Sequence, residues 1–138
     1  MQSSNMQCSA RVLIVDESED SRDVFRTILE RRGMQILEAP EARRGLEILR
    51  EQHPEVVVLD LESCAADEAA VQTAYGAEVE STNTTLVVLG NLLTDNASGR
   101  HVASGRHVVH KPYHYGPLIR KIEQLVEGSL TKDRKLVG

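Results

Sequence analysis

The chain has 138 residues, of which 41% are hydrophobic and 27% charged, and this balance is typical of one soluble globular domain rather than a disordered or membrane-spanning chain. Its formal net charge is −5, with one Phe, three Tyr and no Trp, so it lacks the basic surface and the stacking platforms with which proteins bind nucleic acid directly.

Nothing in the sequence predicts a membrane or export route. The apolar runs are too short to cross a bilayer, and the polar stretch of residues 1–10 lacks the apolar core of a secretory signal. Cys8 and Cys64 form no metal or disulfide motif, which favours a reducing compartment. We therefore expect a cytoplasmic protein with no membrane partner.

Short apolar runs alternate with amphipathic segments along the chain. The periodicity predicts strands at Arg11–Val15, Met34–Ala39, Glu55–Asp60, Thr85–Leu89 and His107–Val109. It predicts helices at Asp20–Arg32, Glu41–Gln52, Asp67–Glu80, Thr94–Ala103 and Tyr115–Glu127. The run Val56–Leu59 is apolar on both faces, as in a parallel strand covered on both sides. Five strands alternating with five helices indicate an α/β fold with a parallel sheet and helices on both faces.

Charged residues stand where three of these strands end. Asp16 and Glu17 follow the first strand, Asp60 ends the third, and Lys111 follows the fifth. Because the carboxyl ends of parallel strands share one edge, we expect these groups to meet there. Carboxylates suit Mg²⁺, an ionised Asp is a usable nucleophile, and a lysine can neutralise phosphoryl oxygens. The combination predicts phosphoryl transfer onto Asp60. The alternative for Asp16 and Glu17 is a solvated turn that caps the following helix.

The segments Val15-Asp16-Glu17, Val57–Asp60 and Lys111-Pro112-Tyr113 resemble, in order and spacing, the signature of the response regulator receiver domain of two-component signalling. The resemblance covers residues 11 to 127. It implies a flavodoxin-like (βα)5 sandwich with strand order 2-1-3-4-5. It implies a signalling domain rather than an enzyme, with at most self-catalysed phosphotransfer and dephosphorylation.

The resemblance also implies roles and partners. Asp60 is the phosphoacceptor, which receives its phosphoryl group from a sensor histidine kinase or a histidine phosphotransfer protein. Asp16, Glu17 and Asp60 hold Mg²⁺, to which Glu62 lends its main-chain carbonyl, and Lys111 completes the site. A homodimer is possible.

Two positions depart from the family pattern. Gly90 stands where the family has a Ser or Thr whose hydroxyl drives the switch, and Val108 replaces the switch aromatic. Asn91 is the neighbouring residue that could donate a hydrogen bond instead. These departures keep open a pseudo-receiver that binds partners without phosphorylation. A third reading, a phosphatase suggested by Asp60-Leu61-Glu62-Ser63, is weaker because its nucleophile would follow the first strand.

The ends differ from the middle of the chain. We expect a flexible N-terminus over residues 1–10, the receiver domain over 11–128, and a flexible tail or the start of a linker over 129–138. The sequence leaves open whether the chain is a stand-alone receiver or a fragment of a longer regulator.

Overall fold

The computed structural model describes residues 10–60, 68–90 and 106–137. Its strands are β1 (Arg11–Val15), β2 (Gln35–Ala39), β3 (Val56–Asp60), β4 (Thr85–Leu89) and β5 (Arg106–Val109). Its helices are α2 (Glu19–Arg31), α3 (Ala42–Gln52), α4 (Glu68–Thr82) and α6 (Tyr115–Val137). The bounds agree with the predicted ones to within one or two residues, except at the end of α6. The helix predicted at Thr94–Ala103 lies outside the described residues.

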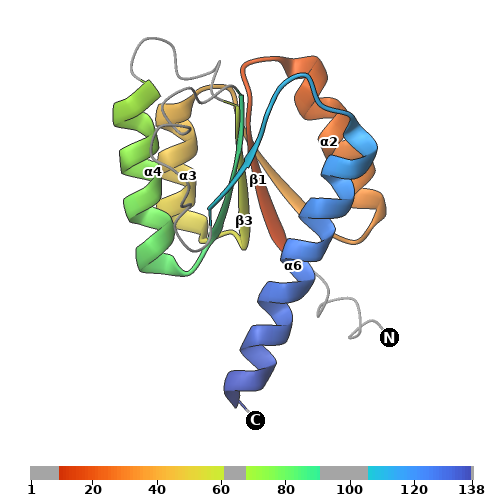
Figure 1. Cartoon of the computed structure of the whole chain (residues 1–138), viewed down its shortest axis with the longest axis vertical. Coiled ribbons are helices and arrows are strands. Elements are labelled where there is room, and N and C mark those ends of the chain that lie inside the picture. The colour runs from red at the N-terminus through yellow and green to blue at the C-terminus, as the bar shows by residue number, and fades with distance from the viewer. Residues whose placement is uncertain (1–9, 61–67, 91–105, 138) are drawn as a thin grey trace.

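The strands form one parallel sheet in the order β2-β1-β3-β4-β5, which confirms the predicted flavodoxin-like topology. Helices α3 and α4 cover one face, and α2 and α6 cover the other (Figure 1). Because all the strands are parallel, the carboxyl ends of β1, β3 and β5 lie at the same edge of the sheet. This edge is where the charged residues gather.

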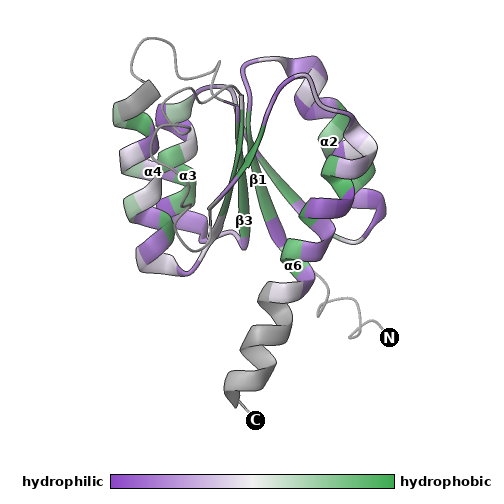
Figure 2. Ribbon diagram, in the orientation of Figure 1, coloured by the Kyte–Doolittle hydropathy of each residue, from purple (hydrophilic) through white to green (hydrophobic). Residues whose placement is uncertain are grey.

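Alternation along the strands sorts their side chains into two cores. The core beneath α3 and α4 takes Leu13, Val15, Val57, Leu59, Leu86 and Val88 from the sheet. The core beneath α2 and α6 takes Val12, Ile14, Val56, Val58, Val87 and Leu89. Figure 2 shows this arrangement, with green, apolar strands lying between two layers of helices. The continuous apolar runs in the sequence are thus explained by burial on both faces.

A glycine allows α3 to approach the sheet closely. A Cβ atom on Gly45 would lie 2.6 Å from Val15 Cγ2 and would also clash with the Tyr75 hydroxyl. Tyr75 is fully buried, and its hydroxyl donates to the Ala42 carbonyl of α3 at 2.6 Å. Gly45 therefore makes room for the tyrosine that links α4 to α3.

Helix α6 runs to Val137, beyond the predicted end at Glu127. Gly128 costs a helix only about 1 kcal/mol relative to Ala, and residues with good helix propensity, such as Leu130, Lys132 and Arg134, follow it. The end of α6 extends past the sheet (Figure 1). The role of residues 129–138 as a tail or linker stays a prediction.

Within the described ranges, no helix has the length and apolar content that a bilayer crossing requires.

Candidate functional site

Two predicted site residues from distant segments are in direct contact. The Lys111 ammonium donates to Asp60 Oδ1 at 2.9 Å and to Oδ2 at 3.0 Å. Asp60 ends the buried strand β3, and 8% of its side chain is exposed, against 22% for Lys111. The carboxylate thus lies at the sheet edge with a cation directly beside it.

Asp16 adds a second buried carboxyl to this edge. Only 4% of the residue is exposed, and its Oδ1 accepts a hydrogen bond from the Ser18 backbone N–H at 2.9 Å. Burial raises the pKa of Asp16, and the nearby Asp60 carboxylate raises it further, whereas the Ser18 N–H and Lys111 act in the opposite direction. Two carboxylates can share a hydrogen bond only when one is protonated. With both ionised, Asp16 Oδ2 is buried without a donor in the described part of the chain.

This orphaned oxygen is what a divalent cation would satisfy. Mg²⁺ in proteins commonly takes one or two carboxylates and completes its octahedron with water and phosphate oxygens. Asp16 and Asp60 supply two carboxylates, and the exposed Glu17 follows in sequence. Over residues 10–60, 68–90 and 106–137, no group of three or more acidic, His or Cys side chains is preformed around one point. The donor set therefore fits a cation with many water ligands better than a fully protein-bound one.

The remaining predicted residues divide into described and undescribed ones. Val108 is half-buried and packs against the core beneath α3 and α4. Gly90 is buried at the end of β4, and its N–H donates to the Val109 carbonyl at 3.0 Å. Its φ of +147° lies where L-residues are rarely found. Glu62 and Asn91 lie outside the described residues, so their predicted roles stay predictions.

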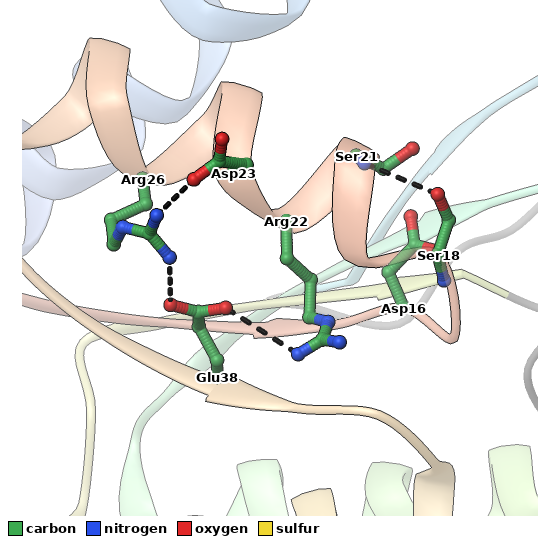
Figure 3. A network of polar contacts seen from close by, with 7 residues as sticks. All are labelled: Asp16, Ser18, Ser21, Arg22, Asp23, Arg26 and Glu38. Carbon is green, nitrogen blue, oxygen red and sulfur yellow. Dashed lines mark hydrogen bonds and ion pairs between the residues drawn. The ribbon is translucent and has the colours of Figure 1, made fainter.

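Salt bridges fix the helix that follows Asp16. Glu38 of β2 accepts from Arg26 at 2.6 Å and from Arg22 at 3.5 Å, and Arg26 also pairs with Asp23 (Figure 3). The Ser18 hydroxyl caps the helix by accepting from the Ser21 N–H at 3.2 Å. The start of α2 is therefore held against the sheet, and with it the loop that carries Asp16.

Tyr113 follows Lys111 closely in the chain, and the sequence did not single it out. It is half-buried two residues after Lys111, and its pKa is raised by burial, by Tyr115 and by the carboxylates of Asp60 and Asp16. Its ring meets that of Tyr115 edge to face, with centroids 5.6 Å apart. The signal in the sequence was only its place in Lys111-Pro112-Tyr113, which gave it no role.

Comparisons with known proteins agree with this fold and with the family resemblance of the sequence. The family model of the response regulator receiver domain matches residues 12–62. Protein PilH of Pseudomonas aeruginosa is 27% identical over 86% of this chain and 99% of its own length. A probable transcriptional regulator, ycf27, of Galdieria sulphuraria is 29% identical over 79% of this chain, which spans 42% of that protein. The receiver domain of the Francisella response regulator 1452 has the same fold, with a TM-score of 0.72, 19% identity, and coverage of 88% of this chain and 99% of that one.

Proposed function

Since the chain is a receiver domain of two-component response regulators, we propose that Asp60 accepts a phosphoryl group from a sensor histidine kinase or a histidine phosphotransfer protein. The contact of Lys111 with both oxygens of Asp60 carries this proposal, because it combines a nucleophile and a charge-neutralising cation at one sheet edge.

In the proposed reaction an Asp60 carboxylate oxygen attacks the phosphorus of a phosphohistidine. A P–O bond forms on Asp60 as the P–N bond breaks, and its electron pair stays on the donor imidazole, which takes a proton from water. Such transfer depends mostly on positioning and charge neutralisation. Lys111 can follow the charge from the carboxylate to the phosphoryl oxygens by a small movement of its ammonium.

We assign Asp16, Glu17 and Asp60 to the metal site, with Glu62 as a main-chain ligand implied by the family resemblance. A bound Mg²⁺ would neutralise part of the phosphoryl charge and relieve the repulsion between the two carboxylates. Asp16 supports this assignment because its buried Oδ2 has no donor among the described residues. A cytoplasmic location and a homodimer belong to the same proposal.

Incubation of the full chain with Mg²⁺ and acetyl phosphate tests the proposal. We expect intact mass spectrometry to show one added phosphoryl group on the wild type and none on Asp60→Asn. Asp20→Asn, on the exposed first turn of α2, is the matched control and should be labelled like the wild type. Equal labelling of wild type and Asp60→Asn, or no labelling of either, would reject Asp60 as the acceptor.

One observation favours a second candidate, a pseudo-receiver that binds its partner without phosphorylation. The φ of +147° at Gly90 is unfavourable for Ser or Thr, so the missing side chain matches the local backbone. A site with no response to phosphorylation would need no hydroxyl there. If neither Mg²⁺ nor beryllofluoride binds in calorimetry, this second function replaces the first.

A further inference from the structure

One carboxylate of β2 contacts two successive turns of α2. Glu38 Oε1 lies 3.5 Å from Arg22 Nη1, and its Oε2 accepts from Arg26 Nη1 at 2.6 Å (Figure 3). The two arginines are four residues apart, so they lie one above the other on the same face of the helix. Because each oxygen takes one arginine, Glu38 restricts both the sliding and the rotation of α2 along β2.

Arg22 depends on this carboxylate. Only 16% of its side chain is exposed, and its Nε has no partner in the described part of the chain. Removing the charge of Glu38 would leave a largely buried cation unpaired, and that costs far more than breaking an exposed ion pair. Glu38 therefore influences where Arg22, and with it the start of α2, lies against the sheet.

Backbone contacts connect this ion pair to Asp16. The Arg22 N–H donates to the Ser18 carbonyl at 3.1 Å, and the Ser18 N–H donates to Asp16 Oδ1 at 2.9 Å. On the other side, the Asp16 N–H donates to the carbonyl of Ala39, the residue after Glu38, at 3.1 Å. These contacts form a ring that begins and ends on β2. Both the main chain and the carboxyl of Asp16 therefore depend on how α2 is held against β2.

The orientation of this carboxyl decides what Asp16 can bind. Its Oδ1 is occupied by the Ser18 N–H, which leaves Oδ2 buried and without a donor among the described residues. A shift of Ser18 would free Oδ1 and let the carboxyl rotate. Groups that orient a ligand from behind commonly change metal affinity by about 10–100-fold when they are replaced.

We propose that Glu38 is a positioning residue of the candidate metal site. It holds α2 to β2 through Arg22 and Arg26, and so keeps the Ser18 N–H on Asp16 Oδ1 and Oδ2 directed at the cation. Glu38 acts through these neighbours and not as a ligand. The inference rests on the metal site proposed above.

The test is a calorimetric titration of the full chain with Mg²⁺. Glu38→Gln should weaken Mg²⁺ binding about tenfold, the lower end of the usual range for a group behind a ligand. Arg26→Gln breaks the more exposed half of the contact and should weaken binding in the same direction, which keeps the test valid if Glu38→Gln does not fold.

Two controls separate this role from loss of a charge or of an ion pair. Glu78→Gln is matched in burial, at 23% exposed against 24% for Glu38, but its partner is Arg50, so the pair joins α3 to α4. Asp23→Asn removes a negative charge from α2 itself, at an exposed position. Both controls should bind Mg²⁺ within about twofold of the wild type.

Amide hydrogen exchange without metal gives a readout that general loosening of the fold does not reproduce. Glu38→Gln should speed exchange of the Ser18 amide and leave that of Thr85, which donates to the Glu55 carbonyl at 3.0 Å before β4, unchanged. Wild-type Mg²⁺ affinity in the folded variants, an equal loss in Glu78→Gln, or unchanged Ser18 exchange overturns the role of Glu38 and leaves Asp60 as the proposed acceptor. Failure of the wild type to bind Mg²⁺ overturns the metal site as well.

Discussion

Replacing Asp16 by Asn should stabilise the metal-free protein. In the wild type at neutral pH, the buried Oδ2 has no donor in the described part of the chain, and Asp60 lies nearby with the same charge. The amide removes the charge, keeps an oxygen for the Ser18 N–H, and offers an N–H to Asp60. Relief of an unsatisfied buried group is worth about 1–3 kcal/mol, and we expect about 1 kcal/mol after repacking. For a domain of this size that raises Tm by roughly 2–5 °C.

The gain should depend on pH in a defined direction. Because the pKa of Asp16 is raised in the folded state, the protonated carboxyl is favoured there. Its stabilising contribution is complete below the unfolded pKa and is lost as pH rises through the folded pKa. The difference between Asp16→Asn and wild type should therefore be largest near neutral pH and shrink on acidification through that range.

Mg²⁺ should reverse the order of stability. A ligand at a hundred times its Kd adds about 2.7 kcal/mol to the protein that binds it. Wild type should gain this amount, and Asp16→Asn much less. Urea unfolding with and without Mg²⁺, at several pH values, measures both effects, with Glu19→Gln of the exposed first turn as the control. A variant less stable than wild type without metal, or equally stabilised by Mg²⁺, would refute the reasoning.

Three further substitutions test the packing and the charge pair. Gly45→Ala should lower the free energy of unfolding in urea by about 1–3 kcal/mol, because its Cβ has no space beside Val15 and Tyr75. The control is Gly128→Ala, whose Cβ meets nothing within 4 Å and which should not destabilise the protein. Equal effects of the two substitutions would contradict the close contact at Gly45. Gly90→Ala should cost about 1–3 kcal/mol in the same assay, since its φ is +147°, and an unchanged unfolding free energy would argue against that conformation. Lys111→Met should lower the free energy of unfolding of the wild type by about 1–3 kcal/mol at pH 7, and by clearly less in the Asp60→Asn background. Additive losses in this double-mutant cycle would exclude direct coupling between Lys111 and Asp60.

Much of the fold could be predicted because its patterns are local. The run Val56–Leu59 predicts a strand covered on both faces, and the structure buries every residue of β3. The predicted end of α6 at Glu127 is wrong, because Gly128 favours a helix end but the residues after it favour helix, and the helix continues to Val137. Propensity at a single glycine does not decide between a cap and an interior position.

The sequence by itself determined which residues stand at the strand ends, because alternating elements of a parallel fold bring those ends to one edge. It also determined that Asp60, Lys111 and Asp16 carry the charges there. Only the tertiary structure decided that Lys111, 51 residues from Asp60, contacts both of its oxygens. It likewise decided that Asp16 Oδ2 is buried without a donor in the described ranges. Such distances depend on strand register, loop paths and aromatic packing between segments far apart in the chain, and no local pattern encodes them.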